Sequence, residues 1–365
     1  MKRPLIVLAI AVGLLLSYLL AWPVPIEPEA WQAPENRGLT GLFVQNDALS
    51  NAKAFGLGVF EGPEDVALGG DGALYATTSD GSVIRIGPAS DTITKFASVD
   101  GRPLGIEANS DGELFIANAY VGIQKISRDG SVSNLLTSID GVPLVYADDL
   151  AVGADGTIYF SEASTKFGAE AWGGSYTASL LDIMEHGGHG RIIAFDPGSG
   201  DVRVIIDGLN FANGVALSED QQFLLVAETG SYRILKHWLQ GPDAGTTEVL
   251  IDNLPGFPDN INSGSDGRFW VGFVAPRNAM LDGLSDKPFL RKLVQRLPAW
   301  ARPRARPSSH VIAISGDGEV LANLQDPDAT YPLMTGVCET SERLYLTRLF
   351  GQQLPYVEKN VLIRQ

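Results

Sequence analysis

Five oxygen-bearing side chains lie at the same point of a short segment that recurs along this chain. They belong to Glu64, Asp148, Asn213, Asp259 and Asn260. Aspartate and asparagine at the start of a strand often make turns only, so none of the five carries weight by itself. Equivalent positions in four segments do carry weight, and carboxylate and amide oxygens without cysteine or histidine are what calcium prefers. The pattern predicts one Ca²⁺ site, provided that the fold brings the segments together.

The repeat itself predicts such a fold. The segments begin at Glu64, Gly105, Asp148, Asn213, Asp259 and Gly336, at intervals of 41, 43, 65, 46 and 77 residues. After most of them comes an Asp-Gly turn signal, as at Asp111-Gly112, and then a β-rich run such as 114–116. A strand, a tight turn and a second strand at a period of about 40 residues are typical of a propeller blade. We therefore expect an all-β, six-bladed β-propeller, in which the inner strands surround one axis and the repeated positions converge.

Composition narrows the possible partners. The formal net charge of −16 argues against a nucleic-acid partner, because phosphate binding needs a basic surface. One cysteine, Cys338, excludes an internal disulfide framework and a cysteine-rich zinc site. The four histidines fall outside the repeated positions, which disfavours zinc altogether. A small-molecule substrate is the expected partner.

The N-terminus predicts a membrane anchor. Lys2 and Arg3 precede an uncharged stretch from Leu5 to Trp22, long enough at about 1.5 Å per residue to cross a bilayer. Cations before the span predict a cytoplasmic N-terminus and a propeller outside the cytoplasm, in the periplasm or another extracytoplasmic space. A cleaved signal peptide, which would give a secreted protein, is the alternative. The expected division is an anchor or signal segment at 1–22, a stiff linker at 23–47 and the propeller at 48–365.

Two insertions interrupt the blade rhythm, at about 163–190 and 275–310. The first is expected to form a loop or short helix over one face of the propeller. The second has Leu290, Leu293, Val294 and Leu297 at helical spacing, among several lysines and arginines. Such a helix could lie on a membrane surface or pack on the propeller with its basic side in water.

Several motifs, in order and with matching spacing, resemble the strictosidine-synthase-like proteins, and in particular the branch typified by adipocyte plasma-membrane-associated protein. They include 62–65 (GPED), 101–105 (GRPLG), 147–150 (ADDL), 211–215 (FANGV), 226–229 (VAET) and 255–261 (PGFPDNI). The resemblance implies a propeller of the calcium-dependent phosphotriesterase superfamily, which includes paraoxonases and gluconolactonases. It also implies roles for individual residues: Glu64, Asn213, Asp259 and Asn260 match ligands of the catalytic calcium, and Asp65 and Asp149 match residues near a second, structural calcium.

The chain departs from the family pattern at two positions. Relatives usually carry asparagine where this chain has Asp148, and the extra carboxylate should bind calcium more tightly but lower its Lewis acidity. Leu104 stands where paraoxonases carry a histidine proposed as a base, so a histidine-dependent mechanism is not expected.

The expected activity is calcium-dependent hydrolysis of an ester or lactone, as in arylesterases and lactonases. The calcium would polarise the carbonyl while Asp259 positions or deprotonates water, or attacks directly, and Glu64 serves mainly as a ligand. Arg102, next to Leu104 in the substrate-binding region, could orient an acidic group. No Gly-x-Ser-x-Gly elbow supports a serine hydrolase.

Two alternatives stay open. Glu339 falls where strictosidine synthase carries its catalytic glutamate, which suggests a condensing enzyme. A membrane-tethered binding propeller with a structural calcium is the other, because fold alone does not decide function.

Overall fold

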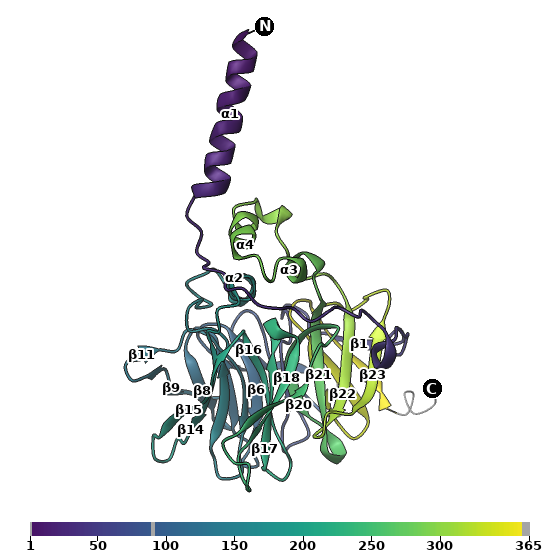
Figure 1. The fold of residues 1–365 in the computed structure, drawn as a ribbon. Helices are drawn as coiled ribbons and strands as arrows, with labels where there is room; N and C mark the ends of the chain where they lie inside the picture. Colours follow the sequence, from purple (N-terminus) through teal and green to yellow (C-terminus); the bar gives the residue numbers. More distant parts are fainter. Residues whose placement is uncertain (1, 89–91, 360–365) are drawn as a thin grey trace.

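Six four-stranded antiparallel sheets surround one axis in a computed structural model that describes residues 2–88 and 92–359. The predicted six-bladed β-propeller is thus confirmed (Figure 1). In each of the first five blades the chain runs from the inner strand outward through three hairpins. The first blade contains β2 (Val66–Leu68), β3 (Leu74–Thr77), β4 (Ser82–Ile86) and β5 (Ile93–Ser98). The second contains β6 (Pro103–Ala108), β7 (Leu114–Asn118), β8 (Gly122–Ile126) and β9 (Val132–Leu136).

The next three blades follow the same order. The third contains β12 (Ala147–Val152), β13 (Ile158–Glu162), β14 (Gly190–Phe195) and β15 (Val202–Leu209). The fourth contains β16 (Ala212–Leu217), β17 (Phe223–Glu228), β18 (Arg233–Trp238) and β19 (Thr247–Ile251). The fifth contains β20 (Gly256–Ser263), β21 (Arg268–Pro276), β22 (Ser309–Ser315) and β23 (Val320–Asp326). A small hairpin of β10 (Ser138–Ile139) and β11 (Val142–Pro143) precedes the third blade.

The sixth blade closes the ring with strands from both ends of the chain. It contains β24 (Met334–Glu339), β25 (Arg343–Arg348), β26 (Gln353–Glu358) and, outermost, β1 (Lys53–Gly56). β1 pairs antiparallel with β26 from Lys53 opposite Tyr356 to Gly56 opposite Gln353. The N-terminal strand therefore holds the last blade next to the first.

The inner strands share an irregularity near their start. In β6, β12, β16, β20 and β24 the pairing with the second strand shifts register over two residues, among them Asp148-Asp149, Asn213-Gly214 and Asp259-Asn260. A bulge of this kind turns adjacent side chains in unrelated directions. Two neighbouring residues can therefore serve two different places along the axis.

Apolar side chains between neighbouring blades form the core. One cluster joins the second and third blades, through Phe115 and Phe160, and another joins the fourth and fifth, through Leu225 and Phe269. Inner-strand glycines let the blades approach closely. A Cβ on Gly214 would collide with the backbone of Ile261 in the next blade.

Both insertions lie at the end of the propeller where the inner strands begin, on the same side as the N-terminal helix (Figure 1). The first carries α2 (Ser175–Glu185), and the second carries α3 (Ala279–Gly283), α4 (Pro288–Gln295) and the 3₁₀ turn η4 (Ala299–Ala301). The other 3₁₀ turns are η1 (Gly41–Phe43), η2 (Thr229–Ser231) and η3 (Ser265–Gly267). The N-terminal helix α1 (Lys2–Ala21) projects away from the propeller, and by length and composition Arg3–Ala21 could cross a membrane.

Apart from η1, the segment 23–47 forms no helix or strand, and it packs against both insertions. Ile26 is fully buried, and Trp31 stacks on His186 with ring centroids 3.9 Å apart. The buried Arg291 of α4 donates hydrogen bonds to the carbonyl oxygens of Glu29, Met184, Glu185 and Ser285. We call 23–47 the strap, because it ties α1 to the insertions.

Candidate functional site

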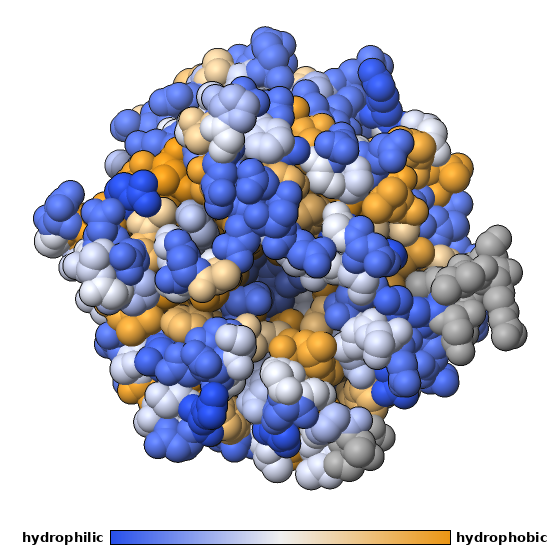
Figure 2. Space-filling view, turned by 90° about the horizontal axis from the view of Figure 1, so that it is seen from below, coloured by the Kyte–Doolittle hydropathy of each residue, from blue (hydrophilic) through white to orange (hydrophobic). Residues whose placement is uncertain are grey.

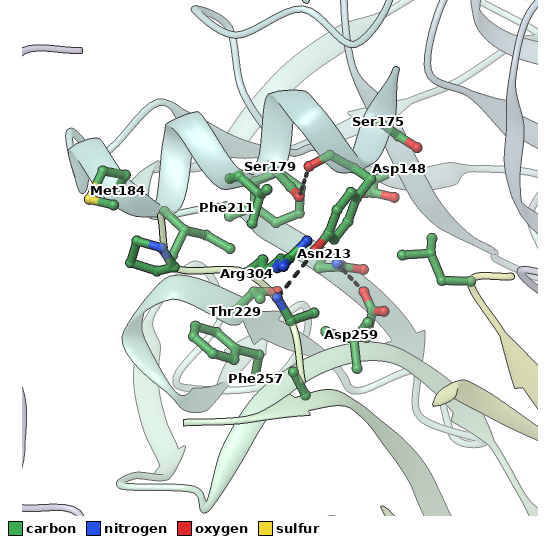
Figure 3. A pocket seen from close by; sticks show the side chains of 18 of the residues that line it. Asp148, Ser175, Ser179, Met184, Phe211, Asn213, Thr229, Phe257, Asp259 and Arg304 are labelled. Atoms are coloured by element: carbon green, nitrogen blue, oxygen red, sulfur yellow. Dashed lines mark hydrogen bonds between the residues drawn. The ribbon is translucent and has the colours of Figure 1, made fainter. Parts of the chain in front are cut away.

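A cavity lies where the inner strands begin, beneath α2 and the second insertion. The space between its walls is about 810 Å³, which includes the part that opens to solvent. Its polar residues include Glu64, Asp148, Asn213 and Asp259, four of the five oxygen-bearing residues singled out in the sequence. Its remaining lining is mostly apolar and includes Leu104, Ile183, Phe211, Phe257 and Leu281. Figure 3 shows Asn213 and Asp259 facing one another, with Phe211 and Phe257 nearby.

The fifth residue, Asn260, is fully buried next to Glu64. Its amide nitrogen donates to the Glu64 carbonyl oxygen at 3.2 Å and to Glu64 Oε1 at 3.3 Å. Asn213 donates through Nδ2 to Asp259 Oδ1. The Glu64 carbonyl oxygen also accepts from Thr335 Oγ1 at 2.5 Å, which fixes the backbone there against the sixth blade. The predicted residues therefore do converge from different blades.

Burial and mutual repulsion disfavour the charged form of the carboxyl groups at this site. Burial raises the pKa of Glu64 well above its ordinary value, and the charges of Asp259 and Asp148 raise it further. The pKa of Asp148 is raised for the same reasons, burial first and then Asp259. Burial also raises the pKa of Asp259 to about 7, although the hydrogen bond from Asn213 acts in the opposite direction. A cation bound here would stabilise the charged form of all three carboxyl groups.

Three oxygens of the cluster have no hydrogen-bond partner in the described part of the chain. They are Glu64 Oε2, Asn213 Oδ1 and Asn260 Oδ1, and all three are buried. Buried polar atoms normally have a partner, so an orphaned set calls for an ion or water. Carboxylate and amide oxygens in a buried, anionic cluster fit calcium. Within residues 2–88 and 92–359 no three His, Cys, Asp or Glu side chains alone form a metal-binding group, so a cation here needs the amides.

Asp65 and Asp149, which the sequence connects with a second calcium, lie farther along the axis and already have partners. Asp65 Oδ2 accepts from the Ile106 amide of the second blade at 3.0 Å. Asp149 Oδ2 accepts from the Val215 amide of the fourth blade at 2.8 Å. Each carboxylate thus joins two neighbouring blades through a buried hydrogen bond.

Arg102 and Leu104 flank the cluster differently. Leu104 lines the cavity and contributes to its apolar wall. Arg102 is buried and is not among the residues that line the cavity. Its positive charge partly offsets the rise in the pKa of Glu64 and of Asp148. The arginine therefore acts on the carboxylates as a buried counter-charge.

Glu339 lies at the other end of the axis. It lines the polar opening of the opposite face with Asp65, Glu107 and Asp149, and Figure 2 shows the hydrophilic hollow at the centre of this face. Glu339 Oε1 is 2.5 Å from Lys359 Nζ, and Oε2 accepts from Trp270 Nε1 at 2.6 Å. The structure therefore does not bring Glu339 together with the other candidate catalytic residues, because β24 carries it through to the far end of the axis.

The roof of the cavity consists of residues that the sequence did not single out. Tyr176 and Ser179 come from α2, and Arg304 and Ala305 follow η4. Tyr176 Oη accepts a hydrogen bond from the Ala305 amide at 3.2 Å, which links the two insertions over the cavity. No residue pattern identified them; their place in the insertions was the one signal.

Comparisons with known proteins identify the family. The sequence model described as strictosidine synthase matches residues 148–242, and the strictosidine synthase-like N-terminal model matches 41–86. Adipocyte plasma membrane-associated protein of Rattus norvegicus is 33% identical over 370 residues, covering 93% of this chain and 95% of the relative. The chain belongs to the strictosidine-synthase-like family. Other members include the human adipocyte plasma membrane-associated protein, 34% identical over 91% of this chain and 83% of the relative, and strictosidine synthase-like 6 of Arabidopsis thaliana, 33% identical over 79% and 77%.

Solved structures share the fold of this strictosidine-synthase-like protein. A gluconolactonase from Xanthomonas campestris aligns with a TM-score of 0.61 at 17% identity, over 84% of this chain and 89% of that one. Regucalcin from Agrobacterium tumefaciens, described as a calcium-binding protein, aligns with a TM-score of 0.54 at 13% identity, over 82% and 93%. At these identities the likeness shows the propeller and no more.

Proposed function

We propose that this protein is a calcium-dependent hydrolase of esters or lactones, with its active site in the cavity beneath the insertions. The observation that carries the proposal is the set of three orphaned, buried oxygens among mutually repelling carboxylates. Two of the three belong to Glu64 and Asn213, which line a largely apolar cavity.

Five residues would hold the calcium: Glu64, Asp148, Asn213, Asp259 and Asn260. When bound, calcium polarises a substrate carbonyl and stabilises negative charge on its oxygen. Glu64, Asp148 and Asp259 all line the cavity, and Asp259 is the most exposed of the three, at 7%. We therefore assign to Asp259 the role of orienting a water molecule and accepting its proton. The apolar wall, with Phe211 and Phe257, would bind the hydrocarbon part of the substrate and exclude bulk water.

The two alternatives are not equally supported by the structure. Little supports a condensing enzyme based on Glu339, because that carboxylate pairs with Lys359 and accepts a hydrogen bond from Trp270 at the opposite end of the axis. A binding propeller with a structural calcium keeps the same cluster but predicts no turnover. Under either function we place the propeller outside the cytoplasm, because Lys2 and Arg3 precede α1.

A substrate panel tests the proposal. The full-length protein in detergent would be assayed against lactones and aryl esters, with calcium, after chelation and after calcium is restored. We expect hydrolysis that chelation abolishes and calcium restores, and that Asp259→Asn removes. Asp317→Asn is the matched control and should keep full activity, because Asp317 is an exposed residue in the turn between β22 and β23. Calcium binding without turnover on any substrate would support the binding propeller instead.

A further inference from the structure

The outer side of the second insertion combines exposed apolar and basic side chains. Phe289 and Trp300 are 55% and 76% exposed, and Met280 and Leu290 are also exposed. Seven basic residues lie between 286 and 306. Arg291 and Arg296 are buried, Lys292 and Arg302 are half-buried, and Lys287, Arg304 and Arg306 are exposed. Asp286, which pairs with Lys287 at 2.7 Å, is the one acid of this stretch, in a chain of net charge −16. We call the exposed and half-buried residues named here the roof surface.

The helical pattern by itself suggests that Arg291 and Arg296 belong to a basic side that faces the membrane. Both are buried, so neither contributes to such a side. Both use their guanidinium groups to bind backbone carbonyls instead. Arg296 donates to the carbonyl oxygens of Trp22 at 2.6 Å and Leu19 at 3.0 Å, and its own carbonyl oxygen accepts from Tyr18 Oη at 3.0 Å. The last turn of α1 is thus fastened directly to the second insertion, which carries the roof surface.

This attachment sets the level of the roof surface relative to a bilayer. A helix of 20 residues rises about 30 Å, the thickness of the hydrocarbon core, so its last turn lies at the membrane–water interface. Tyr18 and Trp22 stand at that turn, with ring centroids 5.8 Å apart, and tyrosine and tryptophan are enriched at this depth in membrane proteins. Whatever is fixed to this turn lies at the level of the lipid headgroups.

The roof surface is also continuous with the cavity. Asn278, Pro303, Arg304 and Ala305 line both the cavity and an outer groove that includes Met280, Arg302 and Arg306. Figure 1 shows α3 and α4 between the propeller and α1. The wall of the cavity on this side is therefore the inner side of the roof surface.

We propose that the roof surface rests on the surface of an anionic lipid bilayer and that the cavity receives its substrate from the membrane. Exposed aromatic residues would enter the interface while the basic residues of the roof surface bind anionic headgroups. The acidic remainder of the protein would be repelled, which keeps the opposite face away from the lipid. The substrate class that follows is an amphiphilic ester or lactone with a long hydrocarbon chain; this part rests on the proposed function.

Site-specific labelling of the full-length protein in vesicles tests the surface. In a Cys338→Ala background, Trp300→Cys and Leu68→Cys would each carry an environment-sensitive dye; Leu68 is exposed beside the opposite opening. In phosphatidylcholine vesicles that contain phosphatidylglycerol, we expect lipid-borne nitroxide to quench the dye at 300 and aqueous iodide to quench the dye at 68. Equal iodide quenching at both sites would overturn the proposal.

A second measurement tests the route. The double variant Phe289→Glu, Trp300→Glu should hydrolyse a long-chain ester dissolved in vesicles several-fold more slowly than the parent, and a short-chain ester in water equally fast. Equal loss on both substrates, or no loss on either, would refute entry from the membrane. If the parent hydrolyses nothing, the proposed function fails, while the quenching comparison still decides whether the roof surface contacts lipid.

Discussion

Without calcium, the protein should become less stable as the pH rises, and Asp259 allows the effect to be estimated. Its pKa is raised from the ordinary 3.8 to about 7 in the folded protein. The folded state therefore binds a proton that the unfolded chain has released, and the free energy of unfolding falls as the pH rises between these values. At 1.36 kcal/mol per pKa unit, the difference corresponds to at most about 4 kcal/mol.

Thermal unfolding with a chelator measures this loss. For a propeller of this size, about 4 kcal/mol corresponds to a fall of roughly 6 °C in Tm between about pH 4 and pH 7. Glu64 and Asp148 act in the same direction, because burial raises their pKa values as well. Calcium should remove most of the fall, since it binds the deprotonated cluster of the folded state.

Asp259→Asn provides the decisive comparison. The amide oxygen can still accept from Asn213, but the buried charge is gone. In chelator at about pH 8 the variant should unfold at a higher temperature than the parent, and with calcium it should gain less. A metal-free parent whose Tm rises with pH, or a variant with the same pH dependence as the parent, would refute the reasoning.

Three further predictions concern residues outside the calcium cluster. Asp149→Ala should lower the free energy of unfolding by about 1–3 kcal/mol in chemical denaturation, because the buried Val215 amide loses its acceptor; an unchanged calcium affinity in titration calorimetry would exclude a metal role. Arg291→Met should release the strap, since four carbonyl oxygens lose their donor, and limited proteolysis should then cleave within 23–47; a cleavage rate equal to the parent's would contradict this contact. Glu339→Gln should weaken the contact with Lys359 and cost about 1 kcal/mol of stability without changing calcium binding or hydrolysis, whereas selective loss of activity would restore the condensing alternative.

The repeated pattern was sufficient to predict the blades, because each blade is a local unit. Hairpin turns such as Asp111-Gly112 and the alternating strands around them depend on residues close in sequence, so they can be read without a structure. Convergence of Glu64, Asn213 and Asp259 followed from ring symmetry, since equivalent positions of inner strands must meet at the axis.

The separation of adjacent acids required the tertiary structure. Asp148 lines the cavity while Asp149 binds the next blade, because a bulge in β12 turns them apart. The sequence shows two neighbouring aspartates and no sign of the bulge. In the same way it places Glu339 on an inner strand but does not say at which end of the axis that strand's last residue emerges.

What the sequence determined by itself is the repeat, and with it the ring of blades, the acidic and amide oxygens at the axis and the apolar N-terminal helix. What only the tertiary structure decided is how distant segments close on one another: β1 completing the sixth blade, the strap held by Arg291, and Arg296 fastening α1 to the roof. The physical reason is that these contacts run from side chains to backbone carbonyls or between backbones. Such contacts depend on where the chain passes and leave no periodic signal in the residues.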